Sequence, residues 1–209
     1  MKNLVLFSML LLSTASFAQS NYDKAMANGL MQLKDAKTSQ QMAASSAYFE
    51  RIANSEKTNW LPYYYAAWTN ILSGWMDEKS DKDKIATKAN ELIAQAEANS
   101  KENSEIYCLK QMSAVMAMSV DPMSRYQTYG AEAMSALEKA KKLDPTNPRP
   151  YLLEAQSVFY TPEQFGGGKA KAKPIFEKAI EMFGKFNPES EISPQWGLDQ
   201  AQDGLKGCE

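Results

Sequence analysis

The chain has 209 residues, of which 23 are basic and 25 acidic, for a net charge of −2. This balance creates no field that would attract nucleic acid or an anionic membrane, so neither is expected as a partner. The chain has no His, which removes the commonest general base, the Ser–His and Cys–His nucleophile pairs and His-based metal sites. We therefore expect a protein that is not an enzyme and that holds no metal or cofactor.

The first residues follow the pattern of a secretory signal peptide. Lys2 is basic, residues 4–12 are almost wholly apolar, and Ser16-Phe17-Ala18 has the small residues of a cleavage site. The apolar run is too short to span a membrane as a helix, and no later segment is long and apolar enough to do so. There is no Cys near the cleavage point, so a lipid anchor is not expected. We predict a signal peptide at 1–18, a mature domain at 19–209, and a periplasmic or secreted location.

The first half of the mature chain predicts two helical pairs, because apolar residues recur at spacings of three and four and no alternating strand pattern is present. The first pair covers about 21–36 and 39–54, and Thr38 or Ser39 caps its second helix. The second pair begins at Trp60 and continues, after a charged connection at 77–84, to about Ala98.

The second half predicts two more pairs and a final helix. The third pair begins at Ser104 and turns at Asp121-Pro122 into one long helix that ends at Leu143. The fourth begins after Asn147, a predicted N-cap, and its two helices flank a Gly-rich loop at 161–168. The last segment, 195–205, has the polar residues expected of a capping helix.

The helical pairs repeat with a fixed period. Tyr63, Tyr107 and Tyr151 recur every 44 residues. The helices that precede Tyr107 and Tyr151 carry a small–large–small motif, with Ala133, Leu137 and Ala140 as its best example, and Ser45, Phe49 and Ile52 hold the same positions before Tyr63. Ala89, Ile93 and Ala96 repeat that motif one period earlier, and Ala172, Phe176 and Ala179 repeat it five residues ahead of strict register. A period of this size is typical of a helical solenoid.

These residues resemble the tetratricopeptide repeat (TPR) family. The family pattern has Ala, a large apolar residue four positions later, Ala three positions after that, and Pro five positions further on. Ala133, Leu137, Ala140 and Pro145 match this pattern in full. The spacing of 44 is longer than the usual TPR period of about 34 and falls in the range of HEAT and armadillo repeats. The resemblance implies an all-α, right-handed superhelical array of antiparallel hairpins, with about four repeats and a C-terminal capping helix.

The resemblance also implies a partner-binding groove. In TPR proteins the first helices line a concave face, at positions one, five and eight residues after the aromatic one. The matching groove residues here are Tyr64, Trp68, Ile71, Cys108, Met112, Val115, Leu152, Gln156 and Phe159. Such an aromatic and Met-containing face would suit an apolar peptide or helix. The alternative is that this stripe packs against other helices as core.

The Gly-rich loop offers a second candidate site. Gly166-Gly167-Gly168-Lys169 lacks the first Gly and the Ser/Thr of a phosphate-binding P-loop. Glycine amides at a helix start, next to Lys169, could still hold an anion at Gly167 and Gly168. The alternative is a glycine turn before a solvated helix. The segment 159–179 is also similar to a loop and helix in the periplasmic TPR component of some tripartite solute transporters.

The two Cys residues are not expected to pair. Cys108 and Cys208 lie two repeats apart, and stacked helices advance by roughly 10 Å per layer. That separation exceeds the reach of a disulfide unless the C-terminal tail folds back.

We predict a non-enzymatic periplasmic or secreted adaptor that binds a protein or peptide through the apolar groove. The alternative is a small-molecule or lipid carrier, related to transport, that uses the same groove for an apolar ligand. A hydrolase that depends on carboxylates would need two acidic residues in one pocket, and the sequence gives no sign of such a pair.

Overall fold

The computed structural model describes residues 21–209, and every regular element within that range is helical. The predicted signal peptide, 1–18, lies outside the described residues. The chain is helical over 21–34 and continues in nine further α-helices and two short turns of other helix types. In order they are α2 (Ser39–Glu56), α3 (Trp60–Met76), α4 (Lys82–Asn99), α5 (Ser104–Met118), α6 (Pro122–Arg125), η1 (Tyr126–Gly130), α7 (Ala131–Leu143), α8 (Arg149–Tyr160), η2 (Glu163–Phe165), α9 (Lys169–Phe183) and α10 (Leu198–Gly207).

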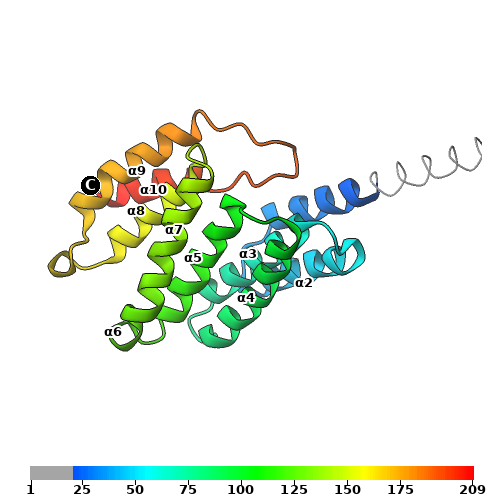
Figure 1. Ribbon diagram of the computed structural model, residues 1–209, viewed down its shortest axis with the longest axis horizontal. Coiled ribbons are helices and arrows are strands. Elements are labelled where there is room, and N and C mark those ends of the chain that lie inside the picture. Colours follow the sequence, from blue (N-terminus) through cyan, green and yellow to red (C-terminus); the bar gives the residue numbers. More distant parts are fainter. Residues whose placement is uncertain (1–20) are drawn as a thin grey trace, which may run out of the picture.

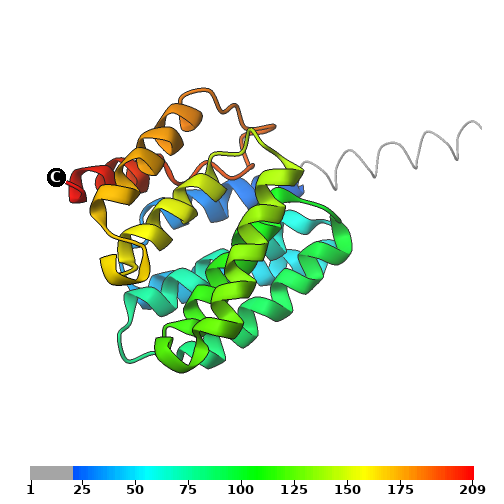
Figure 2. The ribbon, with the colours of Figure 1, turned by 60° about the vertical axis from the view of Figure 1, so that its left-hand side comes forward.

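The helices form four antiparallel hairpins and a last single helix (Figure 1). The hairpins pair 21–34 with α2, α3 with α4, α5 with α7, and α8 with α9. Helix α10 packs on α8 and α9. Figure 2 shows α9 and α10 at the end of the molecule away from α4. This arrangement confirms the predicted TPR-like array with four repeats and a capping helix.

The small–large–small residues of the second helices form the core, as the sequence predicts. Ala89, Ile93 and Ala96 are buried on α4, and Phe49 is buried at the matching position of α2. The remaining motif residues Ala133, Leu137, Ala140, Ala172, Phe176 and Ala179 are buried as well. The small side chains allow the neighbouring helix to approach, while the large side chain between them fills the space.

Side-chain caps fix the helix starts. Thr38 and Gln41 form a reciprocal capping box at α2. Asn59 and Asn103 each accept a hydrogen bond from a backbone amide in the first turn of the following helix. Helix α8 begins at Arg149, one residue later than a cap at Asn147 predicts, although the Asn147 side chain still accepts the Arg149 amide at 3.0 Å.

The predicted long helix from Asp121-Pro122 to Leu143 is wrong in one respect. It is interrupted by η1, a five-residue π-helix between α6 and α7. Arg125, just before η1, donates to the Ala117 carbonyl at 2.9 Å and to the Asp83 carboxylate at 3.0 Å. These bonds hold α6 against the ends of α5 and α4, and the wider turn of η1 takes up the change in direction.

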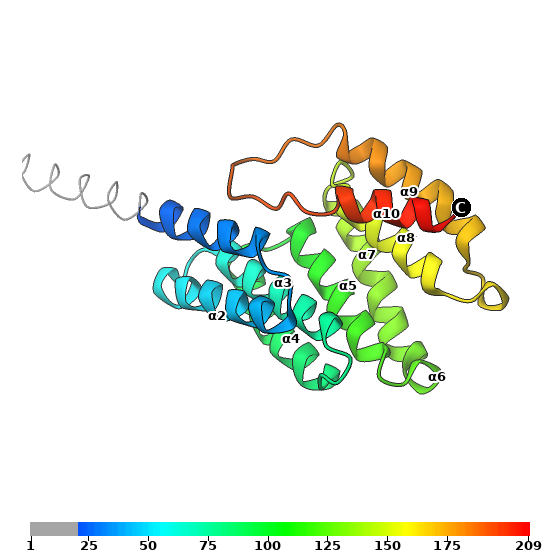
Figure 3. The same ribbon diagram turned by 180° about the vertical axis from the view of Figure 1, so that it is seen from behind.

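The connection between α9 and α10, residues 184–197, is long and irregular. Figures 1 and 3 show it extending from α9 toward the N-terminal helices and returning to α10. It contacts α3 through a hydrogen bond of 2.9 Å that the Tyr65 hydroxyl donates to the Ile192 carbonyl. The last helix begins at Leu198, after Gly197 at a φ of 121°, a value that favours glycine.

Candidate ligand-binding site

The first-helix stripe, defined as the predicted groove residues on α3, α5 and α8, changes in exposure along its length. Tyr64, Cys108 and Leu152, at the amino-terminal ends of the three helices, are fully buried. Ile71 is also fully buried and Trp68 is 8% exposed. Further along α5 and α8 the stripe is half-buried at Met112, Val115, Gln156 and Phe159. The buried part of the stripe is core, and only the half-buried part remains as a predicted groove.

The C-terminal segment covers the buried part of the stripe. The Trp196 ring stacks on the Trp68 ring, with centroids 5.3 Å apart and planes 18° apart. Its indole N–H donates to the Tyr64 hydroxyl at 2.8 Å. Trp196 also packs against the clusters around α8 and α5. The aromatic part of the predicted groove is therefore covered by Trp196 of the same chain.

A buried ion pair anchors this segment. The Arg149 guanidinium, which is 0% exposed, donates to the Glu105 carboxylate at 2.8 Å and to the Pro194 carbonyl. Asn147 and Tyr64 donate to the same carboxylate at 2.8 and 3.1 Å. Burial raises the pKa of Glu105, and the Arg149 charge acts in the opposite direction. The pair connects α5, α8 and the 184–197 connection at one point.

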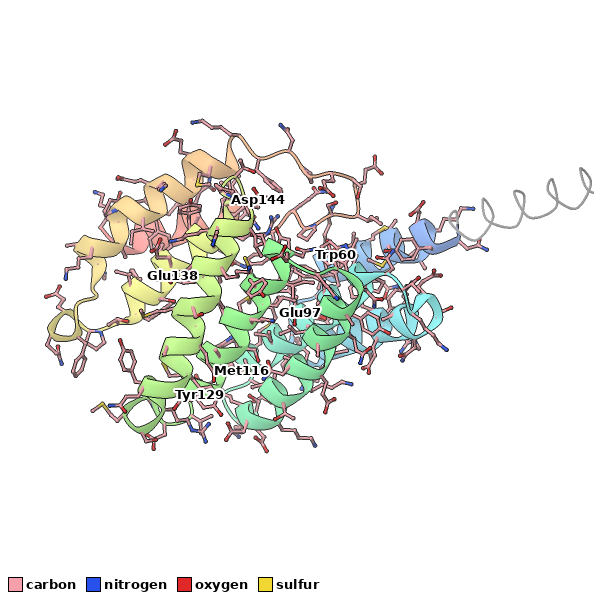
Figure 4. All side chains as sticks on the ribbon, viewed as in Figure 1. Trp60, Glu97, Met116, Tyr129, Glu138 and Asp144 are labelled. Atoms are coloured by element: carbon pink, nitrogen blue, oxygen red, sulfur yellow. The ribbon has the colours of Figure 1, made fainter. Side chains whose placement is uncertain are left out.

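An open groove lies on the other side of α5, between α4 and α7. Its volume is about 810 Å³, within the range of sites for small ligands. Its floor includes Ala114 and Ala117 on α5, while Ile93 and Ala136 line it from α4 and α7. Figure 4 labels two of the lining residues, Glu97 on α4 and Tyr129 on η1. The small floor residues allow a flat molecule to approach α5. We call this surface the α4/α5/α7 groove.

Two lysines in the groove converge on one aromatic ring. The Lys110 ammonium lies 4.5 Å from the centre of the Tyr107 ring, and that of Lys139 lies 6.0 Å from it. Each lysine also has a carboxylate partner. Lys110 pairs with Glu97 at 2.6 Å, and Lys139 pairs with Glu102 at 3.4 Å. Both lysine side chains remain about one-third exposed, so solvent reaches them.

The π-helix positions the other aromatic residue of the groove. Tyr129 lies in η1 and lines the groove at the end distant from Glu97. The Arg125 guanidinium lies 5.9 Å from the Tyr129 ring centre. Hydrogen bonds from Arg125 hold the pKa of Asp83 below its usual range. This ion pair connects the start of α4 to the residue that precedes η1.

A second cavity of about 750 Å³ lies at the amino-terminal ends of α3, α5 and α8. Trp60 and Asp144, both labelled in Figure 4, lie on its lining. Phe186, Ser193 and Pro194 line it from the 184–197 connection. Most of the lining is polar or charged, in contrast to the floor of the α4/α5/α7 groove.

The backbone amides of the glycine loop all donate hydrogen bonds to carbonyls of the loop and of the end of α8. The amide of Gly166 donates to the Glu163 carbonyl at 2.9 Å, that of Gly167 to Pro162 at 3.3 Å, and that of Gly168 to Val158 at 2.9 Å. These bonds leave the hypothesis of an anion site at Gly167, Gly168 and Lys169 without a free glycine amide. The alternative of a structural glycine turn fits this geometry.

Neither Cys is in a disulfide. Cys108 is fully buried, and burial raises the pKa of its thiol well above the usual value, so the thiol is protonated and unreactive at neutral pH. Within residues 21–209, no cluster of three or more Cys, Asp or Glu side chains could hold a metal ion. Over the same range, no helix combines the length and apolar character needed to cross a membrane.

Comparisons with known proteins give structural matches only. No protein-family model matches the chain, and no curated protein matches it in sequence. Among solved structures, the chain is similar to the HusA haemophore from Porphyromonas gingivalis. The TM-score is 0.81 and the sequence identity 36%, over 90% of this chain and 92% of that chain. The chain belongs to the HusA haemophore family.

The HusA-type fold is a TPR-like fold. A thermophilic TPR protein of Thermus thermophilus matches 90% of this chain and 89% of its own, with a TM-score of 0.59 and 16% identity. At that identity the match shows the fold alone. It confirms the resemblance to TPR proteins that the repeated residues carry.

Sequence reasoning did not select the residues of the α4/α5/α7 groove. It used Tyr107 only as a repeat marker and did not single out Lys110 or Lys139. A signal was present, because Tyr107, Lys110, Ala114 and Ala117 follow at helical spacings of three and four on one face of α5. The missing information was the position of α7, since η1 sets how its residues face α5.

Proposed function

We propose that this chain is a non-enzymatic binding protein for haem or a related tetrapyrrole, exported to the periplasm or the cell exterior. The observation that carries the proposal is the similarity to the HusA haemophore, at 36% identity over nine-tenths of both chains. This is the small-molecule carrier that the sequence left open as an alternative. The export rests on the signal-peptide pattern at 1–18.

The α4/α5/α7 groove supports the proposal by its shape and chemistry. Its volume of about 810 Å³ suits a ligand of this size, and its floor of small residues suits a flat one. Tyr107 and Tyr129 offer aromatic surface. With no His in the chain, a protein ligand to haem iron would have to be another residue type, such as Tyr.

Titration of the mature chain, residues 19–209, with haemin tests the function. The expected result is a saturable change in haemin absorbance, with quenching of the four Trp residues, at one haemin per chain. Native mass spectrometry would show the complex. Absence of saturable binding at micromolar concentrations would contradict the proposal.

A matched pair of variants tests the location. Ala94 is exposed on α4 and lines the groove, so Ala94→Trp should fill it and weaken haemin binding about tenfold or more. Ala44 is exposed on α2 and does not line the groove, so Ala44→Trp should bind as the parent does. Equal affinity of the two variants would place the site elsewhere, and the half-buried residues of the first-helix stripe would then be the next surface to mutate.

A second function, binding to a partner protein, is favoured by exposed apolar residues at one end of the molecule. Trp75 and Met76 end α3, and Met123 and Tyr126 lie in α6 and η1; they are 42%, 45%, 82% and 59% exposed. Lys82 lies over the Trp75 ring, and the neighbouring Asp83 binds Arg125. The apolar residues at the end of α3 and those in α6 and η1 therefore lie on either side of the start of α4. Exposed apolar residues grouped in this way are typical of contact surfaces.

Cross-linking in envelope extracts tests the adaptor function. A specific partner should be captured by the parent chain and lost in Met123→Lys. It should be retained in Met31→Lys, because Met31 is 61% exposed but lies in the first hairpin. A partner captured equally by both variants would count against this surface.

A further inference from the structure

We propose that Lys110 and Lys139 bind the carboxylates of the ligand, so that the α4/α5/α7 groove selects planar aromatic molecules with two acidic groups. This inference rests on the proposed function, because it names the chemistry by which the same groove would recognise its ligand. It concerns selectivity, which the similarity to HusA does not address.

The ammonium groups of the two lysines lie close together in the groove. Lys110 comes from α5 and Lys139 from α7, yet both ammonium groups lie within 6.0 Å of the centre of the Tyr107 ring. Two cations beside one aromatic ring can contact two acidic groups on the same edge of a flat ligand, while the ligand's apolar part lies over Ala114 and Ala117. Cations from two helices therefore converge where an acidic ligand edge would lie.

Each lysine can exchange its present carboxylate partner for a ligand carboxylate with little loss of stability. Lys110 is paired with Glu97 and Lys139 with Glu102, and the Glu side chains are 35% and 74% exposed. Ion pairs as exposed as these contribute little to stability, because solvent competes for both charges. A ligand carboxylate can therefore replace Glu97 or Glu102, and the released Glu side chain can turn to solvent. Before the ligand binds, the same Glu residues hold the lysines beside Tyr107.

Arg125, a basic residue beside Tyr129 that does not itself line the groove, differs from the two lysines. Arg125 makes a two-pronged ion pair with Asp83 and also donates to the Ala117 carbonyl, so its guanidinium is committed to the fold. Lys110 and Lys139 make no comparable backbone contact among the hydrogen bonds of residues 21–209. The two lysines are therefore the groove cations that a ligand can recruit.

The test compares haemin with haemin dimethyl ester, in which both carboxylates are blocked. The parent chain should bind haemin about tenfold or more tightly than the ester, and added salt should weaken binding of haemin but not of the ester. Lys110→Met and Lys139→Met should each weaken haemin binding about three- to tenfold and leave ester binding unchanged. Lys88→Met is the matched control, since Lys88 also lies on this array, pairs with Glu50 at 2.6 Å and does not line the groove.

The outcomes separate the two proposals. If neither haemin nor the ester binds, the proposed function fails. If both bind with equal affinity, the chain is a tetrapyrrole binder but the carboxylate inference is overturned. If haemin is preferred and Lys88→Met weakens it as much as the two groove variants, the preference reflects overall charge, and the assignment to Lys110 and Lys139 is overturned. Circular dichroism and melting temperature of each variant confirm that the fold is retained.

Discussion

Arg149 shows how one buried charge can determine several contacts. It has no exposed surface, binds Glu105 and the Pro194 carbonyl, and lies 5.4 Å from the centre of the Trp196 ring. A buried pair of this kind is weak evidence for net stability, because removing both charges from water is costly. Its hydrogen bonds instead fix the position of the C-terminal segment, which an apolar pair could not do with the same directionality.

Replacement of Arg149 tests this role. Arg149→Met should lower the free energy of unfolding by about 3–5 kcal/mol at neutral pH, because the Glu105 carboxylate is left buried without its cation. Lys141→Met removes a partly exposed pair with Glu154 and should cost no more than about 1 kcal/mol. Urea unfolding of both variants measures the difference, and equal losses would contradict an anchoring role for Arg149.

The pH dependence of Arg149→Met follows from the pKa of Glu105. Burial raises this pKa in the parent chain, and the loss of Arg149 removes the charge that lowers it. Between the ordinary and the raised value, the folded state holds a proton that the unfolded state has lost, so stability falls as pH rises. The fall should be larger in Arg149→Met, and part of the lost stability should return near pH 4. A loss that is the same at pH 4 and pH 7 would contradict this explanation.

At the scale of elements, the chain departs from its 44-residue repeat at the irregular turns between helices. The Gly166–Gly168 loop shortens the fourth hairpin by five residues relative to strict register, yet Ala172 and Phe176 still reach the core. The turn is possible because Gly167 has no side chain. A Cβ there would lie 2.2 Å from the Thr161 carbonyl oxygen and 2.6 Å from that of Val158.

Substitution of this glycine tests the packing of the turn. Gly167→Ala should cost about 2 kcal/mol or more, because the obstructing atoms belong to the backbone and cannot rotate away. Gly184→Ala is the control, since its Cβ would meet no atom closer than 3.4 Å and its φ of −65° suits alanine. That variant should be neutral or slightly more stable. Thermal unfolding of the two proteins gives the comparison, and similar melting temperatures would show that the loop can relax.

The elements also show how far sequence reasoning reaches. The period of 44 residues and the small–large–small motif predicted four hairpins, their buried faces and most helix limits, because helix packing depends on spacing along one helix. One feature of the fold was beyond that reasoning. The π-turn at Tyr126–Gly130 depends on where Arg125 finds its partners, and those partners lie on α4 and α5.

The predicted groove shows the same limit at the candidate site. Tyr64 and Trp68 lie on the stripe that the TPR resemblance selects, but a segment more than 120 residues away in the chain covers them. The apolar character of Trp196 was visible in the sequence, whereas its target was not. Pairwise contacts between distant segments leave no periodic signal in one sequence.

At the scale of the whole molecule, the array is closed by contacts between its second and last repeats. Ordinary solenoids transmit stability only between neighbours. Here Ile192 and Trp196 contact Tyr65, Tyr64 and Trp68 across separations of 127 and 132 residues. The unfolding of this chain should therefore be more cooperative than that of an open array.

Trp196→Ala tests this closure. The change should lower the free energy of unfolding by about 3 kcal/mol, through the cavity left beside Trp68 and the loss of the hydrogen bond that the Tyr64 hydroxyl accepts. It should also separate the unfolding of α3 from that of α8–α10 in hydrogen exchange. Trp75→Ala, at a Trp that is 42% exposed, should cost less than about 1 kcal/mol and leave a single transition. A single cooperative transition in both variants would contradict the role of Trp196 in coupling the repeats.

The closure by Trp196 also sets the order in which the chain can complete its fold. Tyr65 and Trp68 are synthesised more than 120 residues before Ile192 and Trp196, which cover them. Contacts between such distant residues form slowly, since a long loop must close first. We therefore expect a nascent chain to keep its aromatic α3 surface exposed until residues 192–196 have been synthesised and can fold back, which would hold the protein in a loosely folded form until then.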